Sequence, residues 1–363
     1  VQAHWFLNPA DCKRSALPEA VDCRYFQNGS FRACAVSHTG ANGIGLIDGC
    51  SRSKLLACEV FDVGGNGITI GNLLNNGAES GDAASDIEVS DCSVHDAARM
   101  AFGCVGIWQA FVPRTRIARN HVYGLPYSAI SIGWRWDDAA SAQRETAVEN
   151  NYIHDYMRML TDGAGIYSLG RQNGAIFRGN VIVNGHNFAN GFQHDQGNSF
   201  ITIQNNLVYN VGEFFVHFNP AHDITYENNI FIQSHMPGVN RSAQNQDHRF
   251  VRNIFYLDRP ELLGGQWQDK LAAAMTFQSN LYFNARGPAV SFPGGSFKAW
   301  QEKGFDAGSL VADPLFANPA GGDFTLRKDS PALRLGFKPF DYTAAGPVRT
   351  APTAAPVKLP PFQ

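Results

Sequence analysis

The sequence predicts an all-β protein, a right-handed parallel β-helix of about ten coils, and two observations carry this prediction. A short strand-like unit recurs along the chain at intervals of 23 to 34 residues. A second stretch with alternating apolar residues follows most copies at a near-constant offset. Repeats of this length that contain strands only cannot bury their apolar faces alone, so they stack as a solenoid. Right-handedness follows from the twist preference of parallel strands joined by crossovers.

Composition agrees with a strand-rich globular domain. The chain has 363 residues, of which 44% are hydrophobic and 17% are charged, and its formal net charge is −3. It also has 36 glycines, which favours strands and turns over long helices. These values exclude a disordered polyelectrolyte and a basic nucleic-acid binder. No apolar run approaches the roughly 18 residues that are needed to cross a bilayer, so we expect no membrane partner. Because the chain is not basic, we also expect no nucleic-acid partner.

The repeated unit starts with Asn or Cys, followed by one variable residue and a β-branched or aromatic residue. An inward Asn at this position can bond the backbone of its own and adjoining coils. We expect the cysteines to act there as small fillers with free thiols, because stacked parallel side chains point the wrong way for a disulfide. The ten lead positions are Cys34, Cys58, Cys92, Asn120, Asn151, Asn180, Asn206, Asn229, Asn253 and Asn280.

One stacked core predicts one main domain. We divide the chain into an N-terminal entry segment (1–30), the β-helix (31–290), and a C-terminal cap with a Pro/Ala-rich tail (291–363). Residues 259–275 and 297–306 resemble short helices, and residues 313–316 with 322–326 resemble a closing strand pair. We expect these segments to cap the open end of the rod, whose bare strand edges would otherwise recruit other chains.

The second stretches predict an outward face that carries the chemistry. Aligned coil by coil, one outward position reads Gly45, Thr69, Gly106, Ser131, Tyr167, Gln193 and His217. Two residues further on, the same face reads Ile47, Gly71, Trp108, Gly133, Leu169, Asp195 and Asn219. We assign substrate binding to the polar and aromatic residues of the middle coils, Trp108, Trp134, Trp136, Tyr167, Gln193, His194, His217 and Asn219.

Aromatic planes beside carboxylates, imidazoles and amides suit sugar rings, which offer apolar C–H faces and hydroxyl edges. Glycosidic cleavage usually requires two carboxyl groups that flank the bond. Asp162, in a glycine-rich turn, and Asp195, on the outward face of the next coil, are the candidate catalytic pair. Glu213 is the reserve candidate, whereas Asp155 fills a recurring turn position and is interpreted as structural. The alternative for the aromatics is that they only cover strand surface.

The stretches Tyr127-Ser128-Ala129-Ile130-Ser131-Ile132-Gly133-Trp134-Arg135-Trp136, Thr161-Asp162-Gly163-Ala164-Gly165-Ile166-Tyr167 and Phe192-Gln193-His194-Asp195 resemble glycoside hydrolase family 141. The resemblance covers residues 90–260 and the ending 313–333. It implies a right-handed parallel β-helix enzyme, similar to α-L-fucosidases and xylanases that act on plant polysaccharides. It also implies that Asp162 and Asp195 are the catalytic pair and that His217 lies in a His-containing strand of the family.

We therefore expect a glycoside hydrolase that acts on a plant-type polysaccharide or oligosaccharide, without a cofactor or a metal ligand. A monomer that is secreted or periplasmic fits this interpretation. Two alternatives stay open. One is a polysaccharide lyase or epimerase, for which Arg135, Arg158 and Arg171 could neutralise a uronate. The other is a non-catalytic carbohydrate-binding β-helix.

Overall fold

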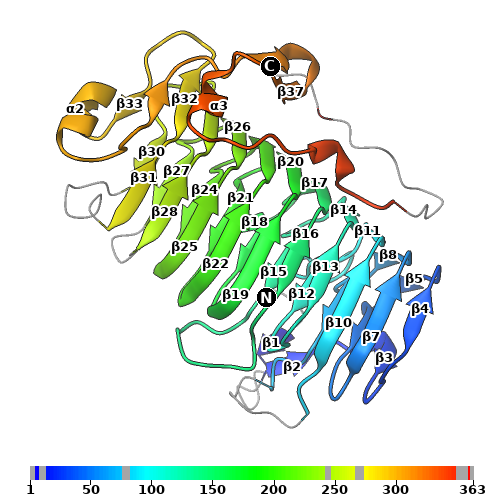
Figure 1. Cartoon of the computed structure of the whole chain (residues 1–363). Helices are drawn as coiled ribbons and strands as arrows, with labels where there is room; N and C mark the ends of the chain where they lie inside the picture. Colours follow the sequence, from blue (N-terminus) through cyan, green and yellow to red (C-terminus); the bar gives the residue numbers. More distant parts are fainter. Residues whose placement is uncertain are drawn as a thin grey trace.

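The chain forms the right-handed parallel β-helix of about ten turns that the repeat predicts (Figure 1). The computed structural model describes residues 5–7, 14–75, 82–241, 247–265, 274–348 and 359. Each turn adds one strand to each of three parallel sheets, which form the faces of a rod. A separate antiparallel pair, β1 (Trp5–Leu7) and β2 (Arg14–Ala16), precedes the rod in the chain.

Sheet one contains the second stretches of the repeat. Its strands are β3 (Glu19–Cys23), β6 (Asn42–Leu46), β9 (Ile68–Ile70), β12 (Ile107–Gln109), β15 (Ile130–Ile132), β18 (Gly163–Ser168), β21 (Ala189–His194), β24 (Val216–Phe218), β27 (Val239–Arg241) and β30 (Leu263–Gly265). The strands pair in this order, so residues 23 to 39 positions apart become lateral neighbours.

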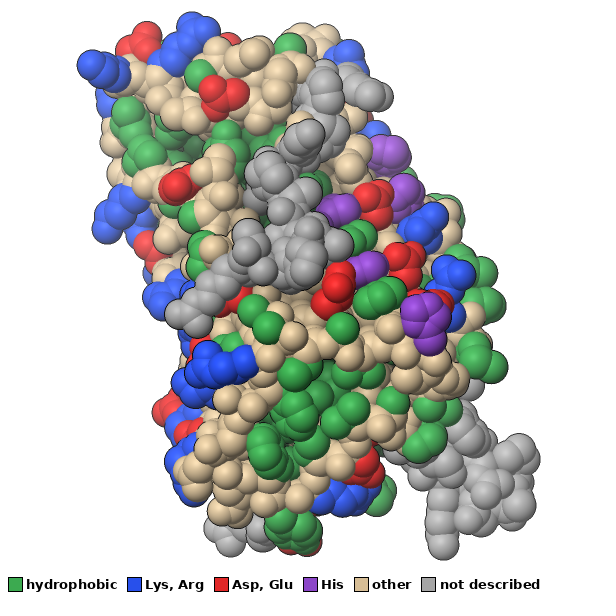
Figure 2. Space-filling view, turned by 90° about the vertical axis from the view of Figure 1, so that its right-hand side faces the viewer, with side chains coloured by type: hydrophobic (Ala, Val, Ile, Leu, Met, Phe, Trp, Pro, Cys, Tyr) green, Lys and Arg blue, Asp and Glu red, His purple; other side chains and the backbone are tan. Residues whose placement is uncertain are grey.

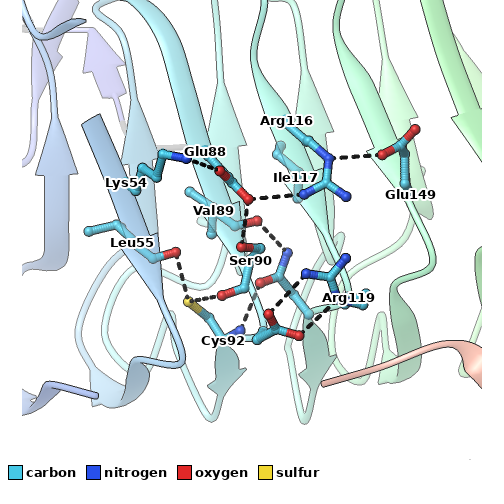
Figure 3. Close-up of polar contacts among 12 residues, drawn as sticks. Lys54, Leu55, Glu88, Val89, Ser90, Cys92, Arg116, Ile117, Arg119 and Glu149 are labelled. Carbon is cyan, nitrogen blue, oxygen red and sulfur yellow. Dashed lines mark hydrogen bonds and ion pairs between the residues drawn. The ribbon is translucent and has the colours of Figure 1, made fainter. Parts of the chain in front are cut away.

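Sheet two follows sheet one in each coil. Its strands are β4 (Ser30–Arg32), β7 (Ser51–Leu56), β10 (Ser85–Ser90), β13 (Arg116–Ala118), β16 (Ala147–Glu149), β19 (Arg171–Arg178), β22 (Asn198–Gln204), β25 (Ala221–Glu227), β28 (His248–Val251) and β31 (Met275–Gln278). Opposite charges alternate across its outer surface (Figure 3). Glu88 bonds Lys54 at 2.9 Å and Arg116 at 3.0 Å, and Arg116 also bonds Glu149 at 3.0 Å. Because each charge meets its opposite only in one register, the pattern favours this pairing.

Sheet three follows the repeated Asn or Cys. Its strands are β5 (Ala35–Thr39), β8 (Glu59–Val63), β11 (Ser93–His95), β14 (His121–Tyr123), β17 (Tyr152–Tyr156), β20 (Val181–Gly185), β23 (Leu207–Val211), β26 (Ile230–Ser234), β29 (Ile254–Leu257), β32 (Leu281–Asn284) and β35 (Leu310–Val311). All ten lead positions therefore precede a strand of this sheet, which confirms the predicted repeat.

The asparagine ladder is continuous inside the rod. From Asn120 to Asn253, each Nδ2 donates to Oδ1 of the next ladder Asn at 2.9 to 3.1 Å. The same Oδ1 atoms accept the backbone N–H of the preceding ladder residue. The Ser309 hydroxyl ends the ladder by accepting the backbone N–H of Asn280. The tight corner thus leaves its buried backbone groups bonded.

Cysteines replace asparagine in the first three coils, as predicted. Cys34, Cys58 and Cys92 hold free thiols, and so do the other described cysteines. The Cys92 Sγ lies 3.4 Å from the Ser90 carbonyl oxygen and 3.6 Å from that of Leu55 (Figure 3). Cys12 lies outside the described residues.

A short helix covers the C-terminal end of the core. In α2 (Phe297–Glu302), Ser296 accepts the Ala299 N–H as the N-cap, and Trp300 is buried. The helix packs beside β33 (Ser291–Phe292) and β34 (Gly295–Ser296). The helix predicted within 297–306 is confirmed. The helix predicted over 259–275 is wrong where the structure describes it, because β30 occupies 263–265 and β31 begins at Met275; residues 266–273 lie outside the described ranges.

The predicted closing strand pair exists, but it covers the side of the rod rather than its end. It consists of β36 (Phe316–Asn318) and β37 (Asp323–Leu326), joined by η1 (Pro319–Gly321) and followed by α3 (Pro331–Arg334) and η2 (Tyr342–Ala344). Figure 1 shows this segment, in orange and red, along the strands of sheet three. The cause is the apolar outer face of that sheet, whose buried members here are Tyr152, Val181, Val183, Leu207, Tyr209, Ile230, Ile232, Ile254, Tyr256 and Leu281. Within the described ranges, no helix is long and apolar enough to span a membrane.

Candidate functional site

Sheet one brings the predicted outward residues of coils four to seven into one row. Ser131, Tyr167, Gln193 and His217 are direct neighbours on β15, β18, β21 and β24. Trp108 was expected two positions further on, but it pairs with Ser131 on one side and with Thr69 of β9 on the other. The predicted alignment of coil three is therefore wrong by two residues.

The shift has a steric cause at the corner before sheet one. Gly43, Gly67 and Gly106 hold equivalent positions there, and the coils approach closely. A Cβ on Gly43 would lie 2.4 Å from the Gly67 oxygen, and a Cβ on Gly67 would lie 2.7 Å from the Gly106 oxygen. Gly106 therefore belongs to the corner, not to the outward row.

The aromatic residues are packed rather than presented as open planes. Trp108, Trp134 and Tyr167 are at most 1% exposed. The Trp134 ring lies 6.4 Å from Trp108 and 6.0 Å from Tyr167, centroid to centroid. Trp136 is half-buried and meets Trp134 edge to face at 5.3 Å. Of the three predicted tryptophans, Trp136 alone keeps an accessible surface that a sugar ring could contact, so the expectation of an open platform is wrong for Trp108 and Trp134.

The loop after β15 accounts for part of this burial. Asp138, in that loop, accepts hydrogen bonds from Arg171 on β19 and from Ser199 on β22, which ties the loop to two later coils. Trp134 has φ of +102°, a conformation that is costly for a bulky residue and that persists only when its surroundings fix it. The loop therefore holds Trp134 between Tyr167 and Trp136.

His194 does not belong to the open face. Its ring points inward and is fully buried, where Nδ1 lies 2.6 Å from the Asn198 Oδ1 and Nε2 bonds the Tyr226 hydroxyl. Strand alternation explains the correction, because Gln193 and His194 are adjacent on β21 and must face opposite sides. Burial lowers the pKa of His194 to about 3.

This buried imidazole predicts a pH-dependent stability. Folding keeps His194 neutral, whereas the unfolded chain binds a proton below its ordinary pKa of 6.5. The stabilising contribution is therefore complete above pH 6.5 and decreases as the pH falls toward 3. We expect the free energy of unfolding in urea to fall between pH 6.5 and 5.5. The contribution of His194 to this decrease should approach about 1.4 kcal/mol per pH unit. The variant His194→Gln should lose this contribution; an unchanged slope would contradict it.

Asp195 is held at the end of β21 by three donors. The Tyr167 hydroxyl donates to Oδ2, the Asn219 amide donates to Oδ1 at 2.9 Å, and the Gln196 backbone N–H donates to Oδ1 at 3.0 Å. Asp195 as a whole residue is 7% exposed. The three hydrogen bonds fix the position of its carboxylate.

Asp162 stands on the adjoining coil at the start of β18 and is exposed. Its Oδ1 accepts the Gln193 amide at 2.8 Å, and its backbone oxygen accepts the Tyr127 hydroxyl at 2.7 Å. Burial, together with the charges of both Asp162 and Asp195, raises the pKa of Tyr127. The two carboxylates, 33 positions apart in the chain, therefore border one cluster of side chains.

His217 and Asn219 complete this cluster on β24 and the residues after it. Burial lowers the pKa of His217, while Asn219, Asp162 and Asp195 act in the opposite direction. The Asn240 amide lies 3.3 Å from the His217 Nδ1. A neutral His217 can exchange a hydrogen bond with a hydroxyl group of a ligand.

Glu213, the reserve candidate, has a distinct electrostatic environment. It lies just before β24 and is half-buried. Burial and, secondarily, the charge of Asp162 raise its pKa to about 7. A carboxyl group with this pKa carries a proton near neutral pH, which is the property required of a general acid.

The polar network reaches the chain beside Glu213. The Asn190 side chain donates to the Gln193 Oε1 at 3.0 Å and accepts the Phe214 N–H at 3.3 Å. Gln193 in turn donates to Asp162, so the amides connect the Asp162 carboxylate with the backbone of the residue that follows Glu213.

Other predicted acids have structural partners. Asp155 bonds His154 and His186, each at 2.7 Å, and these partners lower its pKa to about 2, in line with its structural interpretation. Among the residues that the structure describes, no three His, Cys, Asp or Glu side chains are grouped so that they could hold a metal ion.

No protein-family model matches the chain, and no curated protein matches it. Several solved structures are similar. One is described as a glycoside hydrolase, with 19% identity, a TM-score of 0.46 and coverage of 68% of this chain and 38% of its own. Another is a tailspike protein mutant of E. coli bacteriophage HK620 in complex with a pentasaccharide, with 12% identity, a TM-score of 0.53 and coverage of 79% and 53%.

A third similar structure is a mannuronic acid specific polysaccharide family 6 lyase from human gut microbiota, with 12% identity, a TM-score of 0.36 and coverage of 81% and 85%. The chain spans 38% and 53% of the glycoside hydrolase and the tailspike structure. At such low identity, the similarity to the tailspike protein shows a shared architecture, and this chain is accordingly a member of the parallel β-helix fold class.

Proposed function

We propose that this protein is a glycoside hydrolase that cleaves a glycosidic bond in a plant-type polysaccharide or oligosaccharide. The observation that carries the proposal is the cluster on three consecutive coils in which Asp162 accepts the Gln193 amide, Asp195 accepts the Asn219 amide, and the charges of both act on His217. The charge of Asp162 also acts on Glu213 of the third coil. The resemblance to glycoside hydrolase family 141 supports the same activity, with α-L-fucosidase and xylanase as the reactions to test first. A secreted or periplasmic location fits such a substrate.

Glycoside hydrolysis requires one carboxyl group that donates a proton to the leaving oxygen and one carboxylate that attacks the sugar or activates water. Tyr167 and Asn219 donate hydrogen bonds that position the Asp195 carboxylate for the second of these roles. Asp162, which is exposed and held by Gln193, is the second carboxylate of the pair. Glu213 adds a third carboxyl group, and its raised pKa suits the donor role. The half-buried Trp136 offers an apolar surface for a sugar ring.

The proton-donor role of Glu213 predicts a change in the pH profile. Since the acid is active when protonated, kcat/KM of the wild type should decrease as the pH rises through about 7. In Glu213→Gln this alkaline limb should disappear. Activity on unactivated glycosides should fall roughly 100-fold or more, whereas nitrophenyl glycosides, whose leaving group needs little protonation, should be affected much less. An unchanged alkaline limb would remove Glu213 from the mechanism.

A screen of nitrophenyl glycosides and plant cell-wall oligosaccharides tests the function itself. We expect the wild type to release reducing sugar and Asp195→Asn to release it at least roughly 100-fold more slowly. A polysaccharide lyase is the second candidate, supported by Arg158, whose exposed guanidinium near Asp162 could neutralise a uronate. Absorbance near 235 nm separates the two, since a lyase leaves an unsaturated sugar. A product that absorbs at this wavelength, formed without hydrolysis, would reject the glycoside hydrolase and assign a lyase activity instead.

A further inference from the structure

Exposed apolar side chains gather along one corner of the rod. Ten large hydrophobic residues of the described chain are exposed, and five lie in the connections that lead from sheet three to sheet one. These five are Met100, Phe102, Met159, Phe188 and Met236. The connections belong to coils three, five, six and eight, so the residues form a stripe parallel to the rod axis. Neighbouring coils are about 4.8 Å apart, which gives the stripe a length of about 24 Å.

A pocket opens at the start of this stripe. It encloses about 390 Å³ between three successive connections, which contribute Arg99 and Phe102, then Pro126, then Arg158 and Met159. This volume lies within the range of small-ligand sites and accommodates a sugar ring. Phe102 and Met159 are 43% and 56% exposed, so they offer apolar contact to a ring at the pocket rim.

The charged side chains that line the pocket are Arg99 and Arg158. The Arg99 Nε lies 3.6 Å from Asp62, and both side chains are largely exposed. Arg158 is exposed and forms no ion pair with an acid of the described ranges. The acids at the ends of the nearby strands already have imidazole partners, Asp96 with His95 and Asp155 with His154 and His186. Figure 2 shows histidine, acidic and basic side chains mixed along the right-hand edge of the view.

Two segments that line the pocket lead along the chain to the carboxyl cluster. Arg158 and Met159 lie on the connection that ends at Asp162, and the Met159 N–H donates to the Pro126 oxygen at 3.1 Å. The residue after Pro126 is Tyr127, whose hydroxyl donates to the Asp162 backbone oxygen. The pocket and Asp162 are therefore joined by two short chain segments, 126–127 and 158–162.

We infer that this corner binds an acidic oligosaccharide lengthwise, with the carboxylate of a uronic acid residue in the pocket between Arg99 and Arg158. The guanidinium groups recognise the carboxylate, and the exposed Phe and Met side chains contact the apolar faces of the following sugars. The charge of Arg158 also offsets part of the repulsion between an anionic chain and the acidic cluster. The inference rests on the proposed function only for cleavage of the ligand; binding is independent of it.

Calorimetric titration with tetragalacturonate, with xylotetraose as the neutral probe, tests the inference on the full chain. We expect tetragalacturonate to bind, and Arg158→Gln and Arg99→Gln each to weaken binding by roughly tenfold. Arg32→Gln, which alters an exposed arginine on sheet two, is the matched control and should leave the affinity unchanged. Phe188→Ser should weaken binding of the tetramer but not of monomeric galacturonate.

The outcomes separate this inference from the proposed function. Arginine-dependent binding without hydrolysis or lyase product would retain the inference and reject the proposed function. Hydrolysis of neutral glycans with equal rates in wild type and Arg158→Gln, and no binding of tetragalacturonate, would reject the inference alone. Concentration-dependent dimerisation that Phe188→Ser abolishes would instead assign the apolar stripe to a second copy of this chain and reject the glycan as its ligand.

Discussion

Replacement of Asp195 by Asn should lower kcat/KM for glycoside hydrolysis roughly 100- to 10,000-fold while the fold persists. Asn keeps the shape of the side chain, and its Oδ1 can still accept the Gln196 N–H. The Tyr167 hydroxyl can accept a hydrogen bond from the new amide instead of donating to Oδ2. What the variant loses is the negative charge, which neither a nucleophile nor a general base can lack.

The matched control is Asp223→Asn. Asp223 is also preceded by a histidine, but it lies on β25 in sheet two, is exposed, and bonds only His222 in the contacts of the described structure. Its φ of +52° is one that Asn tolerates. We expect wild-type kinetics from this variant and an unchanged thermal midpoint from both. Near-normal turnover of Asp195→Asn and of Asp162→Asn would end the assignment of the pair.

The repeat was sufficient to predict the fold. Asparagine at the lead position can be recognised in the sequence because it recurs at the same corner of successive coils. There Asn206 and Asn229 donate to the carbonyl groups of Phe177 and Ile203, which would lose these bonds if the asparagines were replaced. The cysteines could be assigned to the same position only from their spacing in the sequence. The C-terminal cover was placed wrongly, because the apolar outer face of sheet three is distributed over many coils and is recognised only when the strands are stacked.

The candidate site was predictable in part. Asp162, Gln193, Asp195, His217 and Asn219 come together because strict alternation and stacking fix their positions. Burial of the tryptophans was not predictable, because it depends on the path of the connections, which sequence alternation does not describe.

The register of coil three could have been found from the sequence. Gly43, Gly67 and Gly106 each directly precede an inward isoleucine of a sheet-one strand, so aligning on these glycines returns the observed pairing. Glu213 gave only a weak signal, because its raised pKa arises from burial that the sequence does not show.

The largest expected effect on stability comes from the middle of the asparagine ladder. In Asn206, Nδ2 donates to Asn229 at 2.9 Å and to the Phe177 carbonyl at 3.0 Å, and Oδ1 accepts the backbone N–H and the amide of Asn180. The variant Asn206→Ala removes these partners in a fully buried site. We expect the free energy of unfolding in urea to fall by about 3 to 5 kcal/mol. Asn173→Ala, at an exposed position of β19, should stay within about 0.5 kcal/mol of wild type.

A double variant decides whether the ladder acts as one unit. If the bonds of Asn180 and Asn206 are coupled, Asn180→Ala/Asn206→Ala should lose less than the sum of the two single variants, because the bond between the two residues is then lost only once. Additive losses would show that each Asn stabilises its own corner independently. If the ladder variants instead lose no more unfolding free energy than Asn173→Ala, water replaces the missing amide. The ladder would then fill space in the corner without determining the stability of the coils that present Asp162 and Asp195.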